Sequence, residues 1–262
     1  MGKYNFDEYI ERRGTGSSKW DGFESRFPGY NAKGAIPMWV ADMDFTAPYE
    51  VIEAIKKKAA LGIYGYPAPR GESFNNAVKD WLKKRHGFEI TDESIVITQG
   101  VVPAITYAVQ AFTNEGDGVL IQPPVYYPFK DRCITYNKRK AVENPLIEKD
   151  GVYTIDFEDF EKKASDQNTK LFILCSPHNP VGRVWSKEEL EKISDICQRH
   201  NVLIFSDEIH SDLIMKGFKH TPTLLVAENK NIISAYAASK TFNIAGLRTS
   251  VIAIKDKEIR EK

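Results

Sequence analysis

The chain has 262 residues, enough for one large domain or two small ones, and its 42% hydrophobic and 27% charged residues are typical of soluble enzymes. Its 36 basic and 36 acidic side chains cancel, and the sequence has no basic stripe, long apolar run or signal peptide, which argues against nucleic-acid binding and a membrane span. Three widely spaced cysteines, and histidines without zinc-ligand spacing, lead us to expect reduced thiols, a cytoplasmic location and no metal.

After an irregular first fifty residues, apolar patterning predicts helices and strands in alternation. Helical spacing predicts helices over 48–61, 71–86, 101–112, 156–164 and 186–200, the last opened by a capping box from Ser186 to Glu189. Short apolar runs predict strands over 95–98, 119–122, 140–144, 171–175, 202–205, 232–236 and 250–254. This alternation predicts an α/β fold with a mainly parallel, seven-stranded sheet between helices.

The run from Ser239 to Arg248 carries the strongest functional signal. Lys240 stands beside a small hydroxyl residue, ahead of a glycine-containing turn and an arginine. A lysine in this setting suits a Schiff base with a phosphorylated aldehyde cofactor, and Ser239 and Arg248 suit its phosphate. An isolated Ser-Lys pair is more often a surface feature, so the interpretation depends on partners upstream.

Two such partners follow predicted strands. Asn179 comes after the run that ends at Cys175, and Asp207 comes after the run that ends at Phe205. Open α/β sheets bind ligands at the carboxyl ends of their strands, so Asn179, Asp207 and Lys240 can meet in one crevice. Asp207 would keep a pyridine nitrogen protonated, Asn179 would donate to the ring oxygen, and Lys240 would remove the α-proton of a substrate. Taken singly, Asn179 is also consistent with a simple turn and Asp207 with a cap; the three in this order favour a site.

With these motifs the chain resembles the fold-type I pyridoxal-phosphate enzymes, the aspartate aminotransferase superfamily, from Phe6 to about Ile254. The asparagine, aspartate and lysine motifs indicate the superfamily. Two further stretches, Arg12–Thr15 and Trp39–Phe45, point to its cystathionine β-lyase branch of MalY/PatB type. The resemblance implies the fold-type I large domain and pyridoxal 5′-phosphate as cofactor.

The resemblance also implies roles for further residues. The backbone at Gly100, Val101 and Val102, where a helix begins, would bind the cofactor phosphate with Ser239 and Arg248. Many members of the lyase branch carry glutamine where this chain has Arg248, and arginine is the commoner choice of aminotransferases.

Other implied residues surround the cofactor ring and the substrate. Tyr126 would stack on the ring, and His210 would tune the ring oxygen or be a packed core residue. Val40 and Ala41 would contact the substrate together with Asn179. Tyr66 would reach the phosphate in a neighbouring subunit, which implies a homodimer.

The resemblance implies a domain arrangement as well. Residues 1–50 would form an N-terminal arm and the first part of a small domain, and residues 51–262 the large cofactor-binding domain. The family fold continues beyond the lysine motif, so we expect the C-terminal small domain, with the arginine that grips the substrate carboxylate, to be absent from this chain.

The sequence therefore favours a carbon–sulfur β-lyase that cleaves an S-substituted cysteine to a thiol, pyruvate and ammonia. An aminotransferase would use the same Lys240, Asp207 and Asn179, and Arg248 favours it. A third hypothesis, of another class, is a regulatory or interaction protein on the same fold.

Overall fold

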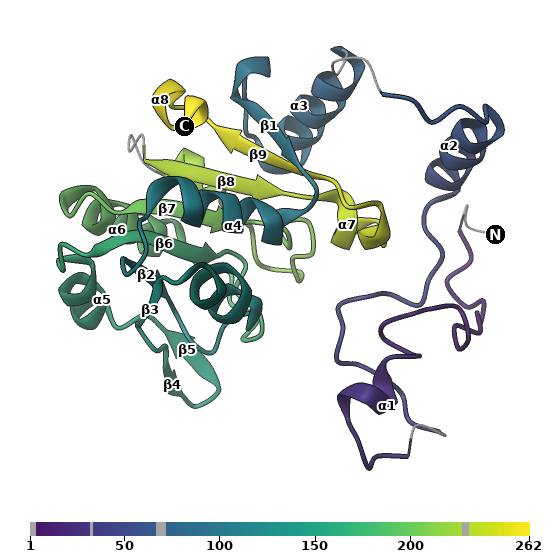
Figure 1. Cartoon of the computed structure of the whole chain (residues 1–262), viewed down its shortest axis with the longest axis horizontal. Coiled ribbons are helices and arrows are strands. Elements are labelled where there is room, and N and C mark those ends of the chain that lie inside the picture. The colour runs from purple at the N-terminus through teal and green to yellow at the C-terminus, as the bar shows by residue number, and fades with distance from the viewer. Residues whose placement is uncertain (1–3, 32–33, 67–71, 227–230) are drawn as a thin grey trace. The chain divides into compact units, whose positions relative to one another are not determined.

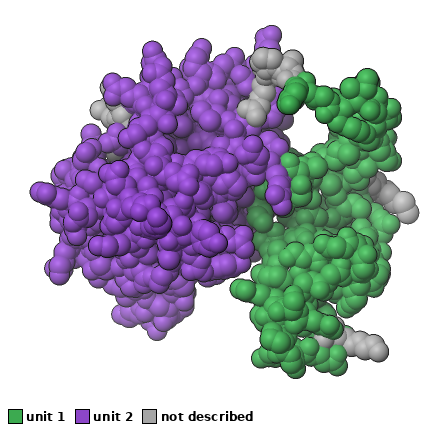
Figure 2. Space-filling model, in the orientation of Figure 1, with its two compact units in different colours: residues 1–66, 238–247 green, residues 67–237, 248–262 purple. Residues whose placement is uncertain are grey.

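The computed structural model describes residues 4–31, 34–66, 72–226 and 231–262 and contains two compact units. The N-terminal unit comprises residues 1–66 with 238–247, and the sheet unit comprises 67–237 with 248–262 (Figures 1 and 2). The segment that carries Ser239 and Lys240 therefore clusters with the N-terminal residues, although strands of the sheet precede and follow it along the chain. The domain division expected from the sequence, 1–50 and 51–262, stays a prediction.

The sheet unit is built on the seven predicted strands (Figure 1). Their spatial order is β1-β9-β8-β7-β6-β2-β3, with β3, β2, β6, β7 and β8 parallel to one another and β9 antiparallel to both of its neighbours. The bounds are β1 (Ile95–Thr98), β2 (Gly118–Ile121), β3 (Lys140–Glu143), β6 (Thr169–Cys175), β7 (Leu203–Asp207), β8 (Ile232–Tyr236) and β9 (Ser250–Ile254). The mainly parallel sheet is confirmed.

The five predicted α-helices are present, with ends that differ by about one or two residues. They are α2 (Tyr49–Ala60), α3 (Glu72–His86), α4 (Val101–Phe112), α5 (Phe157–Ala164) and α6 (Lys187–Arg199). The structure also contains three short helices, α1 (Phe23–Arg26), α7 (Ala238–Thr241) and α8 (Lys257–Glu261). Gly71, the predicted start of α3, lies outside the described residues. The capping box that opens α6 is present, because the Ser186 hydroxyl and the Glu189 carboxylate each accept from the other residue's backbone N–H.

Two cores form on opposite faces of the sheet, because successive side chains of a strand point to opposite sides. On β7, Leu203 and Phe205 pack in the core that contains α4, whereas Ile204 packs in the core that contains α5 and α6. Because this alternation continues to the end of the strand, Asp207 faces the α4 side of the sheet. The next residue, Glu208, faces the α5–α6 side. The end of one strand thus supplies polar groups to both faces.

The structure contains a small hairpin that the sequence did not predict, formed by β4 (Ile147–Lys149) and β5 (Val152–Thr154). Its turn is Asp150-Gly151, both residues with positive φ (55° and 79°), and this dipeptide is a recognised hairpin signal. Single turns of 3-10 helix occupy 92–94, 135–137, 223–225 and 245–247, and a π-helix occupies 129–134. Among the described residues, no helix has the length and apolar content needed to cross a membrane.

Candidate functional site

Asp207 lies at the carboxyl end of β7, in the middle of the sheet. It pairs across the sheet with Cys175 of β6 and Ala235 of β8, and only 5% of its surface is exposed. Its Oδ1 accepts from the backbone N–H of Ile209 at 3.1 Å, and its backbone carbonyl accepts from Ser176 N–H at 3.0 Å. Asp207 is thus a buried carboxylate held by backbone contacts where open α/β sheets bind ligands.

The charge of Asp207 acts on its neighbours on the α4 face. Burial raises the pKa of the Tyr126 hydroxyl, and Tyr127 and Asp207 add to that rise. Burial also raises the pKa of the Cys133 thiol to about 11 and that of Cys175 further still, with Asp207 acting in the same direction on both. Both thiols therefore stay protonated at neutral pH, which makes them core residues and not nucleophiles.

The turn after β6 brings Asn179 to the same end of the sheet. Its backbone N–H donates to the Cys175 sulfur at 3.3 Å. His178, in the same turn, lies 3.1 Å from the Pro124 carbonyl through Nε2 and packs edge-on against Trp185 with ring centroids 5.4 Å apart. Burial lowers the pKa of His178 to about 4, so the ring is neutral and serves to hold the turn. Asn179 itself is only partly buried.

The predicted phosphate site is the start of α4. Gly100, the N-cap residue, has φ +124° and ψ 161°, a conformation essentially confined to glycine. The Thr98 hydroxyl bonds the Gly100 carbonyl at 3.1 Å and the Ser250 hydroxyl at 2.7 Å, which holds the turn to the edge of the sheet. The first backbone N–H groups of α4, beginning at Val101 and Val102, thus form a helix N-terminus suited to an anion.

The aromatic residue expected to stack on a ring is placed on this same face. Tyr126 packs edge-on against Phe129 at 5.7 Å between centroids, and both Tyr126 and Val102 pack against the apolar cluster that contains Val101 and Cys175. A buried carboxylate, an aromatic face and a helix N-terminus on one side of the sheet fit the three parts of pyridoxal phosphate: ring nitrogen, ring face and phosphate.

Lys240 and Ser239 lie in α7, within the N-terminal unit. The Lys240 Nζ donates to the Ala41 carbonyl at 2.9 Å, so the predicted base and the predicted substrate segment Val40–Ala41 meet in this unit. Arg248 is exposed in the sheet unit, with a left-handed φ of 47°, two residues before β9 begins at Ser250. The meeting of Lys240 with the residues of the sheet unit stays a prediction.

Tyr66 and His210 have contrasting surroundings. Tyr66 ends a described segment, and its side chain is fully exposed, at 105% of the reference area. His210 is partly buried three residues beyond Asp207, and its carbonyl accepts from Leu213 N–H at 2.9 Å.

No group of three or more His, Cys, Asp or Glu side chains able to hold a metal ion occurs among the described residues.

Comparison with known proteins identifies the family. The family model for class I and II aminotransferases matches residues 36–262. The chain belongs to this family. The superfamily predicted from the asparagine, aspartate and lysine motifs is therefore confirmed.

Within this family the chain is similar to lyases. It is 50% identical over 260 residues to the cystathionine β-lyase PatB of Bacillus subtilis, covering 98% of this chain and 66% of that protein. Cystalysin from Treponema denticola, whose crystal structure contains pyridoxal 5′-phosphate, superimposes with a TM-score of 0.92 at 47% identity, covering 98% and 65%. The pyridoxal-phosphate-bound C–S lyase of Staphylococcus hominis has a TM-score of 0.92 at 39% identity, covering 99% and 65%. The chain spans less than two thirds of the length of these family members.

Sequence reasoning missed a second buried carboxylate, Glu208. It is fully buried and accepts four hydrogen bonds, from His220 Nε2 (2.7 Å), the Tyr236 hydroxyl (2.8 Å), the Ser234 hydroxyl (3.0 Å) and Thr223 N–H (3.1 Å). Although its burial opposes ionisation, the bonds from His220, Tyr236 and Thr223 lower the pKa of Glu208. The Asp-Glu doublet after an apolar strand was the available signal, because adjacent residues there face opposite sides of the sheet.

Proposed function

We propose that this protein is a pyridoxal 5′-phosphate-dependent carbon–sulfur β-lyase that cleaves an S-substituted cysteine, such as cystathionine, to a thiol, pyruvate and ammonia. The observation that carries the proposal is Asp207, a buried carboxylate at the carboxyl end of a central strand, in a chain 50% identical to a cystathionine β-lyase. Membership of a family with cofactor-bound lyases supports the choice of cofactor.

The chemistry gives each of these residues a separate role. Pyridoxal phosphate, when bound, supplies an electron sink for the carbanion at the substrate α-carbon. Asp207 would hold the proton on the ring nitrogen, and Asn179 would donate to the ring oxygen. The start of α4, with Ser239 and Arg248, would hold the phosphate.

Lys240 moves the proton that starts the reaction. Its amine takes the α-proton of the substrate, the β-carbon–sulfur bond then breaks, and the sulfur leaves with the bonding electrons and gains a proton to become the thiol. Addition of water to the remaining three-carbon fragment gives pyruvate and ammonia, so no external oxidant or reductant is needed.

We also propose a cytoplasmic homodimer in which Tyr66 reaches the neighbouring site. The full exposure of the Tyr66 ring supports this arrangement, since the ring is available to a second copy. The free cysteines, all three buried, agree with a reducing compartment.

An aminotransferase is the second candidate, and Arg248 favours it. Both reactions share the same α-carbanion, and small differences in positioning decide its fate. The test is a product assay with pyridoxal phosphate and L-cystathionine. Pyruvate, ammonia and homocysteine without any keto acid support the lyase; amino transfer that appears only when a keto acid is added makes the aminotransferase primary.

The regulatory hypothesis is tested with Lys240→Ala. The lyase proposal expects this variant to lose product formation while the chain still folds, as judged by circular dichroism. A cellular effect that survives the substitution would favour a signalling surface over catalysis.

A further inference from the structure

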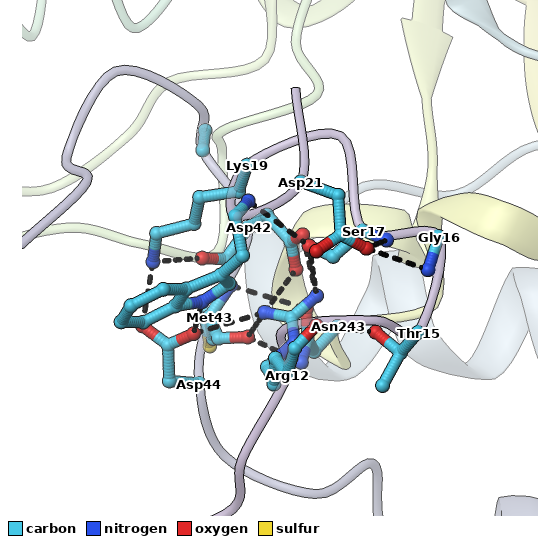
Figure 3. Close-up of polar contacts among 12 residues, drawn as sticks. Arg12, Thr15, Gly16, Ser17, Lys19, Asp21, Asp42, Met43, Asp44 and Asn243 are labelled. Carbon is cyan, nitrogen blue, oxygen red and sulfur yellow. Dashed lines mark hydrogen bonds and ion pairs between the residues drawn. The ribbon is translucent and has the colours of Figure 1, made fainter. Parts of the chain in front are cut away.

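The segment Ala41–Phe45, here called the clamped segment, receives polar contacts from residues 12–21, here called the arm. Arg12 supplies most of them (Figure 3). Its Nη2 bonds the Asp42 carboxylate at 2.8 Å, and its Nη1 bonds both the Met43 carbonyl and the Asp44 carboxylate at 2.9 Å. One guanidinium thus joins three consecutive residues of the segment.

Lys19 and Trp20 add to this contact. The Lys19 amine, in a residue only 7% exposed, donates to the Asp44 carboxylate at 2.6 Å and to the Asp42 carbonyl at 2.8 Å. The Trp20 indole N–H donates to Asp44 at 2.9 Å. Partial burial raises the pKa of Asp44, but the hydrogen bonds from Lys19, Trp20 and Arg12 outweigh this effect and lower the pKa to about 2. Asp44 therefore stays charged at neutral pH and is paired with both Arg12 and Lys19.

The chain that follows Lys240 also contacts the clamped segment. Asn243, in a left-handed conformation with φ 55°, donates through its side-chain amide to the Met43 carbonyl (3.0 Å) and the Phe45 carbonyl (2.8 Å). Its amide oxygen accepts from Met43 N–H at 3.2 Å. The Met43 carbonyl is therefore shared between Asn243 and the arm, and Lys240, three residues earlier, bonds Ala41.

We propose that this network positions Lys240: Arg12 and Lys19 hold the clamped segment, and Asn243 joins it to the chain just after α7, the helix that carries Lys240. The inference rests on the proposed function, since it assigns Lys240 as the base. Proton transfer depends steeply on where the amine lies, and a misplacement of about 1 Å costs roughly a hundredfold in rate. The network also gives a role to the two stretches that resemble the lyase branch, Arg12–Thr15 and Trp39–Phe45. Arg12 of the first stretch binds the clamped segment within the second, and the clamped segment binds the Lys240 amine.

Two substitutions break the network at different points. Asp44→Asn keeps the shape but removes the charge that pairs with Arg12 and Lys19. Asn243→Gly removes the amide that binds Met43 and Phe45, and glycine tolerates the left-handed backbone. Because Asn243→Gly leaves the arm intact, it carries the test alone if Asp44→Asn fails to fold by circular dichroism.

The matched control is Asp21→Asn. The Asp21 carboxylate accepts from the backbone N–H groups of Gly14 (2.8 Å), Gly16 (2.7 Å) and Ser17 (3.0 Å), so it organises the arm. None of these three bonds reaches the clamped segment. The control therefore removes one carboxylate from the same unit without removing a contact to the segment that bonds Lys240.

The readout is the reactivity of the Lys240 amine in the cofactor-free chain, measured by trace acetylation and mass spectrometry with exposed lysines as internal standards. The network predicts a rise in Lys240 labelling of roughly two- to tenfold in Asp44→Asn and Asn243→Gly, the range that loss of one hydrogen bond gives, and no rise in Asp21→Asn. Unchanged labelling in Asn243→Gly, or an equal rise in Asp21→Asn, overturns the inference.

Covalent capture of pyridoxal phosphate, trapped by borohydride reduction, is the second readout. We expect slower capture at Lys240 in both network variants than in the parent. If the parent chain takes up no cofactor, the proposed function fails, while the labelling of the cofactor-free chain still decides whether the network holds Lys240.

Discussion

Removing the charge of Glu208 should destabilise the sheet unit strongly. The carboxylate is fully buried and each of its oxygens accepts two hydrogen bonds, from His220 and Tyr236 on one side and from Ser234 and Thr223 on the other. Glu208→Gln keeps the shape but replaces one oxygen by an NH2 group that faces two donors. An unsatisfied buried group costs about 1–3 kcal/mol, and a hydrogen bond to a charged group contributes about 1.5–3 kcal/mol. We therefore expect a loss of about 3 kcal/mol in the free energy of unfolding.

The loss should also depend on pH, in a direction that the pKa sets. The folded-state pKa of Glu208 is lowered from its ordinary 4.5, so its contribution to stability is complete above about 4.5 and is lost as pH falls through the folded value. The difference between the parent and Glu208→Gln should therefore be largest at neutral pH and shrink as the pH falls below 4.5. Tyr236 does not titrate in this range, because burial and Glu208 raise its pKa well above 10.

The assay is urea unfolding of the chain at pH 7 and at pH 4, followed by far-ultraviolet circular dichroism. Glu191→Gln is the matched control, because Glu191 forms an exposed pair with Lys187 on α6, worth less than about 0.5 kcal/mol. A loss below about 1 kcal/mol in Glu208→Gln, or a difference that does not shrink in acid, would refute the reasoning.

Three further predictions concern single residues. Ser186→Ala removes the capping box of α6 and should cost about 1 kcal/mol in urea unfolding, whereas Ser186→Thr should keep most of the cap. Burial holds the pKa of His178 near 4, below its ordinary 6.5, so between these values the unfolded chain binds a proton that the folded chain does not. The stability of the parent should therefore fall as the pH drops from 6.5 towards 4, and His178→Gln should lose this pH dependence in melting curves recorded at several pH values. Melting temperatures that fall equally with pH in the parent and in His178→Gln would contradict the prediction. Gly100→Ala should cost about 1–3 kcal/mol in stability because alanine is strained at the Gly100 φ of +124°. A clash does not cause this cost, because an added Cβ would lie an ordinary 3.6 Å from Pro103. The variant should also bind the cofactor more weakly in a fluorescence titration, and an unchanged melting temperature would refute the strain.

Local patterns in the sequence determined the sheet, its helices and the family. Buried runs such as Leu171–Cys175 predicted strands because a central parallel strand is apolar on both faces. The Ser186 capping box predicted the start of α6 because the cap joins residues only three apart. The position of Asp207 at a strand end also followed from the sequence, since the apolar run stops there.

Only the tertiary structure decided the partners of the buried and paired charges. Glu208 meets Tyr236 from 28 positions away, and Arg12 meets Asp44 from 32 positions away. No periodicity links such residues, because their approach depends on how strands pair and how the arm folds back. The same reason explains why Asn243 and Lys240 join the N-terminal unit although the chain places them between two strands of the sheet. Hydrogen bonds within a helix, strand or cap follow from neighbouring residues, whereas those across the fold depend on the packing of the whole chain.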